Sequence, residues 1–192
     1  MFTDPFIHPT AVVDAGAQLG AGTKVWHFSH LMPRCRVGAH CIIGQNVFID
    51  NEVVIGDGVK IQNNVSLYNG VVLEDGVFVG PSVVFTNVIN PRSFIERKHE
   101  FQKTLVQTGA SIGANATIRC GIEIGTYAMI GAGAVVTRPV LSFALVYGNP
   151  ARQQGWISKN GYALRFNDRG EAFCNEEEKH YQLHNGGVTV LD

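Results

Sequence analysis

Aliphatic residues recur at every sixth position along most of this chain. Between Val54 and Gly80 the recurring residues are Ile55, Ile61, Leu67, Leu73 and Val79. The same phase runs back to Ile7 and forward to Phe85, and it resumes from Val106 to Val136. Four positions after each of these residues lies a second row, in which every residue is small or aliphatic.

This period of six predicts short strands separated by corners. An α-helix repeats near 3.6 residues, so a spacing of six cannot keep one helical face apolar. A strand alternates inward and outward side chains, as Val59, Lys60 and Ile61 do, and the neighbouring Gly56–Asp57 pair is typical of a turn. About twenty such units follow one another. We therefore predict an all-β fold, a parallel β-helix of the hexapeptide type.

The repeat is interrupted once and ends before the chain does. Residues 86–104, "TNVINPRSFIERKHEFQKT", combine four cations with apolar side chains. We predict an inserted loop that folds over a ligand; a solvated loop with incidental charges is the alternative. After Trp156, apolar and polar residues alternate around a turn at Asn167–Gly170, which predicts a β-hairpin appendage. We divide the chain into a β-helix domain, residues 1–155, and an appendage, residues 156–192.

Composition and charge narrow the classes of function. The formal net charge is −1 and no basic run occurs, which argues against a nucleic-acid surface. No stretch approaches the length of a membrane span, and "MFTDPFIHPT" lacks the features of a signal peptide. We expect a cytoplasmic protein that binds neither nucleic acid nor a membrane. We also expect no metal site, since no two cysteines form a CxxC pair and His180 and His184 are too few ligands for zinc.

Two motifs near the end of the repeat carry a family resemblance. The stretch "IGAGAVVT", Ile130 to Thr137, is followed by "YGNPAR", Tyr147 to Arg152. With the hexads and the single long loop, they resemble the closing signature of the left-handed β-helix acyltransferases. The resemblance implies six to seven triangular coils and a homotrimer, with acetyl coenzyme A (acetyl-CoA) in a groove between subunits. It assigns acetyl-CoA to Gly113, Gly131, Ala132, Gly133, Asn149 and Arg152, and it places Arg152 at the phosphates. Glycines also suit any tight corner, so they are weak evidence by themselves.

Other motifs narrow the resemblance to nucleotide-sugar enzymes. "KIQNNVSLYNGV", "VGPSVVFTNVINPRS" and "TLVQTGASIGANATIRCG" resemble the N-acetyltransferases of bacterial surface-polysaccharide pathways. Our main hypothesis is acetylation of the 3-amino group of UDP-2-acetamido-3-amino-2,3-dideoxyglucuronate, for an O-antigen sugar. The alternative is a sister group that acts on dTDP-3-amino-3,6-dideoxyhexoses. That group tends to have an acidic residue after "FTN", where this chain has Val88.

Asn87 is the predicted catalytic residue. Asn51, Asn69 and Asn87 recur at a spacing of eighteen, and the loop leaves the coil directly after Asn87, so its amide can face a cleft. A left-handed corner conformation is the explanation that we prefer for Asn51. An amide can donate to a thioester carbonyl and orient an amine. The resemblance points to Asn87 and implies that no protein base is needed; His99 in the loop is the histidine alternative.

The nucleotide sugar is assigned to the same corner and to the loop. The predicted contacts are Tyr68, Asn69, Asn90, Arg92 and Lys98. Arg92 follows an Asn–Pro pair, where a rigid turn can fix its guanidinium for a pyrophosphate or carboxylate. Outward Val72, Phe78 and Val84 predict an apolar strip at the subunit contact.

Two other classes of β-helix protein fit the sequence less well. A γ-type carbonic anhydrase needs two metal-binding histidines five residues apart, and no HxxxxH occurs. An ice-binding or scaffold helix would favour rows of outward Thr and no long loop. The outward residues Lys60, Ser66, Val72 and Phe78 form no such row.

Overall fold

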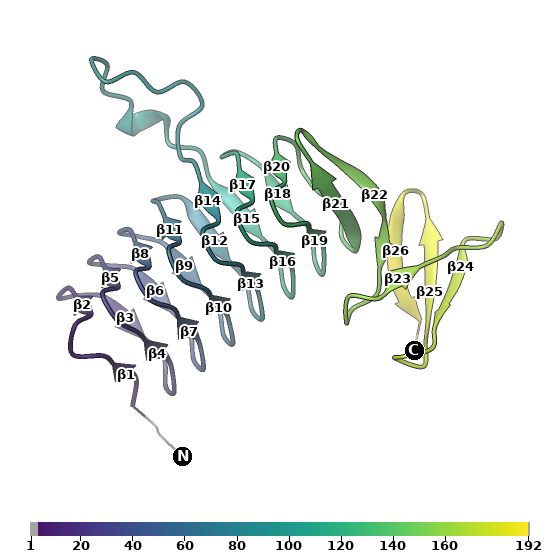
Figure 1. Cartoon of the computed structure of the whole chain (residues 1–192), viewed down its shortest axis with the longest axis horizontal. Coiled ribbons are helices and arrows are strands. Elements are labelled where there is room, and N and C mark those ends of the chain that lie inside the picture. The colour runs from purple at the N-terminus through teal and green to yellow at the C-terminus, as the bar shows by residue number, and fades with distance from the viewer. Residues whose placement is uncertain (1–3, 192) are drawn as a thin grey trace.

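The chain winds into a triangular prism. The computed structural model describes residues 4–191 and shows a parallel β-helix (Figure 1). Twenty strands of two or three residues, β1 to β20, fall on three faces in strict rotation. Because each coil adds one strand to each face, the twenty strands make between six and seven coils, as predicted.

The three faces are named by their order along the chain. The first face carries β1 (Phe6–Ile7), β4 (Lys24–Val25), β7 (Ile42–Ile43), β10 (Lys60–Ile61), β13 (Phe78–Val79), β16 (Ser111–Ile112) and β19 (Met129–Ile130). The second face carries β2 (Val12–Val13), β5 (His30–Leu31), β8 (Phe48–Ile49), β11 (Ser66–Leu67), β14 (Val84–Phe85), β17 (Thr117–Ile118) and β20 (Val135–Val136). The third face carries β3 (Gln18–Leu19), β6 (Arg36–Val37), β9 (Val54–Ile55), β12 (Val71–Leu73), β15 (Thr104–Val106) and β18 (Glu123–Ile124). We call the corner line between the first and second faces the first edge, and that between the second and third faces the second edge.

The two predicted inward rows form the core. Ile61, Leu67 and Val106 are fully buried, as are most members of both rows. Thr23 and Ser29 are tolerated inside because each hydroxyl donates to a carbonyl oxygen at the same edge in the next coil, at 2.7 Å, which satisfies the buried polar atom. Burial by stacked coils is what holds a solenoid together.

Corners are turned by residues with positive φ. On the first edge these residues are Phe28, Asn46, Asn64, Ser82, Asn115 and Gly133. In the coil that contains Asn51, the left-handed residue of the second edge is Glu52, with φ of 62°, and not Asn51. The explanation that we preferred for Asn51 is therefore wrong. Its backbone carbonyl instead accepts a hydrogen bond from Asn69 Nδ2, at 3.0 Å, in the next coil.

The apolar strip expected from Val72, Phe78 and Val84 does not exist. These residues lie on the third, first and second faces, because a step of six residues moves the chain to the next face. Only a step of eighteen returns to the same face. The continuous outward apolar row is Val54, Val72 and Leu105 on the third face, where the three pair directly and are half-buried.

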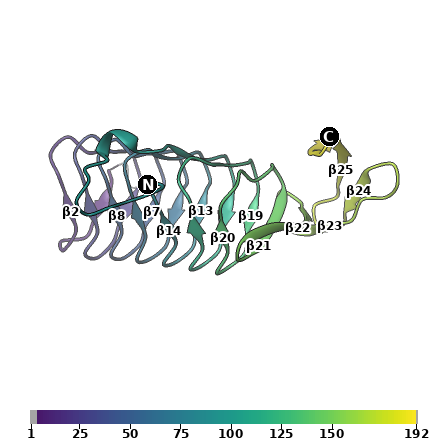
Figure 2. The same ribbon diagram turned by 90° about the horizontal axis from the view of Figure 1, so that it is seen from above.

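The inserted loop leaves the second edge after β14. It spans residues 86–103, one fewer than predicted, because Thr104 already begins β15. It contains one 3₁₀ helix, η1 (Lys98–Glu100), and it projects away from the prism while tilting toward the N-terminal end of the helix (Figures 1 and 2). The backbone N–H of Gln102 donates to the Asn87 carbonyl at 2.9 Å and closes the base of the loop.

The chain after the last coil forms more strands than the predicted hairpin, and the first of them begin before the predicted boundary at residue 156. β21 (Ala144–Gly148), β22 (Ala151–Ile157) and β23 (Ala163–Leu164) extend the first-face sheet. β24 (Glu171–Cys174), β25 (Lys179–His184) and β26 (Gly187–Leu191) form a separate antiparallel sheet of three strands. The turn at Asn167–Gly170 is present, but it joins β23 to β24, which pair with other strands.

A second apolar cluster joins the appendage to the end of the helix. Phe143 from the last coil packs with buried Leu164 and Tyr181. Burial, together with a hydrogen bond to Glu177, raises the pKa of Tyr181 to about 12, so the phenol stays protonated at neutral pH. Among residues 4–191, no helix is long and apolar enough to cross a membrane.

Candidate functional site

Asn87 lies at the second edge, at the exit of the loop. Thr86 just before it still belongs to the coil: its N–H donates to the Ile118 carbonyl, and its Oγ1 accepts from the Cys120 N–H. The side chain of Asn87 is half-buried, and its amide makes no hydrogen bond to any residue within 4–191. An amide anchored by its backbone, with its NH₂ and oxygen still free, can bind a substrate carbonyl or amine.

Asn69, one coil below, differs from Asn87 in what its amide binds. Its Nδ2 donates to the Asn51 carbonyl at 3.0 Å, and its backbone N–H donates to Asp50 Oδ2 at 3.2 Å. These contacts give Asn69 a structural role in the ladder between coils. Tyr68 beside it is 37% exposed, and its ring lies 6.1 Å from that of Phe48 on the second face.

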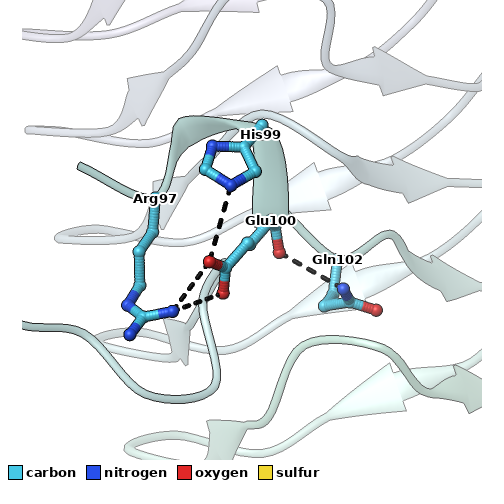
Figure 3. A network of polar contacts seen from close by, with 4 residues as sticks. All are labelled: Arg97, His99, Glu100 and Gln102. Atoms are coloured by element: carbon cyan, nitrogen blue, oxygen red, sulfur yellow. Dashed lines mark hydrogen bonds and ion pairs between the residues drawn. The ribbon is translucent and has the colours of Figure 1, made fainter. Parts of the chain in front are cut away.

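The loop is held by a polar network of its own (Figure 3). Arg97 Nη1 donates to both carboxylate oxygens of Glu100, at 2.7 and 2.8 Å, and Gln102 Nε2 donates to the Glu100 carbonyl at 3.2 Å. His99 Nε2 lies 3.6 Å from Glu100 Oε1, and the imidazole is 76% exposed. The structure therefore pairs His99 with Glu100 at the surface of the loop.

The other predicted loop contacts are exposed. Asn90 and Arg92 lie in the loop before η1, and Arg92 Nη1 donates only to the neighbouring Pro91 carbonyl, at 2.9 Å. Lys98 Nζ lies 3.8 Å from Glu96 Oε1, and both side chains are more than 70% exposed. Such surface pairs stabilise little, so both cations can rearrange to meet an anion.

The glycines assigned to acetyl-CoA lie on the first edge. A Cβ at Gly113 would lie 2.5 Å from Ala132 N, and one at Gly131 would lie 2.7 Å from the Tyr147 Cβ. Gly133 has φ of +69° and open space beside it. Close coil stacking and a left-handed corner thus explain all three without a ligand. Because these glycines have no side chain, the backbone of this edge is accessible, and Ala132 is exposed on it.

Two arginines line a cavity at the end of the helix. It measures about 220 Å³ and is bounded by Thr137, Arg138 and Pro139 on one side and by Arg152 in β22 on the other. Asn149 is exposed at the β21–β22 turn. Sequence reasoning predicted Arg152 but missed Arg138. The signal was present, because Arg138 occupies the corner position of Asn87 two coils later, after Cys120.

The predicted site is therefore split between two edges of the chain. Asn87 and Arg138 share the second edge, whereas Gly113, Gly131 and Gly133 line the first edge. The second face separates the two edges within one chain.

The repeats of this chain match a known family. The family model of the bacterial transferase hexapeptide (six repeats) matches residues 16–51, 52–87 and 103–138, which is more than half of the chain. The chain belongs to this family. A hexapeptide repeat of succinyl-transferase also matches residues 34–69. The left-handed β-helix expected from the sequence is thus confirmed.

Individual relatives place this hexapeptide transferase among acetyltransferases. A dTDP-3-amino-3,6-dideoxy-α-D-galactopyranose 3-N-acetyltransferase from Aneurinibacillus thermoaerophilus is 47% identical over 186 residues, covering 97% of this chain and 95% of the relative. The predicted enzyme class, an N-acetyltransferase, is confirmed.

Solved structures share the fold. A hexapeptide-repeat acetyltransferase from Vibrio cholerae, complexed with acetyl-CoA, gives a TM-score of 0.50 at 25% identity, covering 74% of this chain and 72% of that one. A mutant GDP-perosamine N-acetyltransferase from Caulobacter crescentus, in complex with CoA and GDP-perosamine, gives a TM-score of 0.54 at 22% identity, and the match covers 80% of this chain. The present chain spans 58% of that protein's length.

Proposed function

We propose that this enzyme transfers an acetyl group from acetyl-CoA to the 3-amino group of a dTDP-3-amino-3,6-dideoxyhexose. The observation that carries the proposal is the 47% identity, over almost the full length of both chains, to an enzyme with that named activity. Similarity that also covers the loop and appendage supports a shared acceptor more strongly than similarity confined to the hexads, which occur throughout the family.

This proposal replaces the main hypothesis of the sequence analysis, the UDP-linked glucuronate, with its alternative. Val88 was the residue that favoured the UDP group. In the structure it is half-buried and lines a cavity formed within the loop, together with Pro91 and Phe101. Packing of the loop accounts for an apolar residue at this position, so Val88 does not select the acceptor. The surface-polysaccharide pathway and the cytoplasmic location stay predictions.

In this proposal, Asn87 assists the chemical step. Its free NH₂ donates to the thioester carbonyl as negative charge develops on that oxygen, and its own oxygen accepts from the attacking amine. The amine nitrogen bonds to the carbonyl carbon, the carbon–sulfur bond breaks, and the leaving thiolate takes up the proton that the nitrogen loses. This route needs no protein base, and it leaves exposed His99 without a role in catalysis.

The split between the two edges supports a homotrimer with active sites between subunits. The first edge of one copy offers bare backbone for the pantetheine arm, and the second edge of the next copy offers Asn87. Arg138 and Arg152 supply two guanidinium groups for the coenzyme phosphates. Arg92 and Lys98 on the loop are free to meet the pyrophosphate of the nucleotide sugar.

The test is an assay of thiol release from acetyl-CoA with a panel of amino sugars. The panel pairs dTDP-3-amino-3,6-dideoxygalactose and its gluco epimer with the UDP-linked 3-amino-glucuronate. We expect rapid release with at least one dTDP sugar and little with the UDP sugar. Thiol release with the UDP sugar alone would support the UDP-linked glucuronate instead. Release with no sugar of the panel would contradict both acceptor hypotheses.

A further inference from the structure

A cavity on the second face lies outside every part of the site described so far. It measures about 290 Å³ and opens beside the first edge, along β5, β8 and β11. Its lining includes Phe28, His30, Asn46, Phe48, Asn64 and Ser66. This volume is just below the usual range for small-molecule sites, about 300–1,000 Å³. It suits one nucleoside better than a whole nucleotide sugar.

The cavity presents aromatic faces that the fold itself does not require. Phe28 has φ of 57° and is 62% exposed, at a corner where later coils use Asn, Ser or Gly. A bulky residue in this conformation is strained. Tyr127 and Phe143 also have positive φ, but they pack against each other in the second apolar cluster. Phe28 has no such burial to offset its strain, so its ring is free for a ligand to stack on.

Two side-chain amides give the cavity a hydrogen-bonding pattern. Asn46 Nδ2 donates to Asn64 Oδ1 at 3.0 Å. This bond uses one donor and one acceptor, and it leaves an acceptor on Asn46 beside a donor on Asn64. If the oxygen and nitrogen of both amides were exchanged, the pair would still offer one free donor and one free acceptor. Thymine and uracil present the complementary pair, an N3–H donor beside a carbonyl acceptor.

An aromatic path leads from the cavity toward Asn87. Asp14 Oδ2 lies 3.0 Å from His30 Nε2 and orients that ring, which meets Phe48 edge-on at 5.8 Å. Phe48 in turn lies 6.1 Å from Tyr68, and Tyr68 stands one coil below Thr86 at the second edge. From β5 to β14 is three coils, roughly 14 Å at the usual strand spacing. A nucleoside diphosphate sugar can bridge that span.

We propose that this cavity binds the pyrimidine base of the nucleotide sugar, stacked on Phe28 and Phe48 and read by the Asn46–Asn64 pair. The inference rests on the proposed function, since it concerns the same substrate. The pyrophosphate then runs past Ser66 and Tyr68 beneath the loop cations, and the sugar amine arrives at Asn87.

Calorimetric titration with dTDP tests the cavity without any chemistry. Base stacking on one aromatic ring contributes about 1–3 kcal/mol, so Phe48→Ala should weaken dTDP binding roughly 5- to 150-fold. The double variant Asn46→Gly/Asn64→Gly keeps the left-handed corners and removes both amides, and it should weaken dTDP binding while leaving pyrophosphate binding unchanged. Phe78→Ala, an outward aromatic on the first face, and Ser82→Gly, a positive-φ corner outside the cavity, are the matched controls.

The outcomes separate this inference from the proposed function. Wild-type dTDP binding that both cavity variants lose and both controls keep supports the inference, even if the panel assay fails. Failure of the wild-type enzyme to bind dTDP overturns it. Turnover of a dTDP sugar with an unchanged Michaelis constant in Phe48→Ala overturns the inference and leaves the proposed function intact. Dissociation of the oligomer in Phe48→Ala, seen by light scattering, also overturns it, because the cavity would then be a subunit contact.

Discussion

At the scale of single residues, the corner position of the second edge carries the proposed chemistry. Asn51, Asn69, Asn87 and Arg138 occupy that position in different coils. Asn51 and Asn69 are joined by a hydrogen bond between coils, whereas Asn87 has a free amide at the exit of the loop. The same residue type thus has a structural role below the loop and is available to a substrate beside it.

Asn87→Ala should lower kcat strongly. Loss of one positioned donor to a developing oxyanion costs on the order of 10²-fold or more in turnover. The half-buried corner contributes little to the core, so the oligomer and the melting temperature should stay close to wild type. Steady-state kinetics with saturating acetyl-CoA and amino sugar measure the effect.

Asn51→Ala is the matched control, at the same corner two coils below. It should keep nearly full turnover. His99→Ala separates the two mechanisms, because the exposed imidazole should be dispensable. An inactive His99→Ala beside an active Asn87→Ala would contradict the route without a protein base.

Arg138→Ala and Arg152→Ala should each raise the Michaelis constant for acetyl-CoA. A hydrogen bond to a charged group contributes about 1.5–3 kcal/mol, so each loss should be roughly 10-fold or more. The constant for the nucleotide sugar should change little in either variant. The opposite pattern, a change for the sugar alone, would place the two-arginine cavity on the acceptor side.

At the scale of elements, the inserted loop and the appendage show how far the sequence could be interpreted. The six-residue period predicted the strands, the core rows and the extent of the loop to one residue, because each hexad is a local unit. The six-residue period alone did not show that Val72, Phe78 and Val84 lie on separate faces. One full turn of the β-helix takes eighteen residues, so only residues eighteen apart share a face. The third strand of the appendage sheet depended on pairing between distant segments, which a local pattern does not specify. The cavity at Arg138 could not be predicted either, because it forms only where β22 folds back over the last coil.

Glu100→Gln should loosen the inserted loop. The Arg97–Glu100 pair is partly buried, with the side chains 21% and 36% exposed. Weakening it costs about 1 kcal/mol, which shifts the opening of the loop about fivefold. We expect faster cleavage by trypsin within residues 86–103 and a higher Michaelis constant for the nucleotide sugar.

Glu96→Gln is the control for the loop, since Glu96 makes only an exposed contact with Lys98 at 3.8 Å. It should leave cleavage and kinetics near wild type. Equal cleavage of Glu100→Gln and Glu96→Gln would show that the Arg97 pair does not order the loop.

At the scale of the whole molecule, the proposed active site joins Asn87 of one copy to the glycine-lined first edge of another, because the second face separates these two edges within one chain. Light scattering at micromolar concentration should give three times the mass of one chain. The outward row of the third face runs from Gln18 to Glu123 and includes Arg36, Val54, Val72 and Leu105, so its apolar centre is flanked by a cation and an anion. An active monomer would contradict the shared site.

The most direct test of the account is a competition between the two acceptor classes. Wild-type enzyme receives limiting acetyl-CoA with equal amounts of dTDP-3-amino-3,6-dideoxygalactose and UDP-2-acetamido-3-amino-2,3-dideoxyglucuronate. Mass spectrometry then measures the two acetylated products, whose ratio equals the ratio of kcat/KM. The account predicts that nearly all of the acetyl group appears on the dTDP sugar, and a product pool dominated by the acetylated UDP sugar would contradict it.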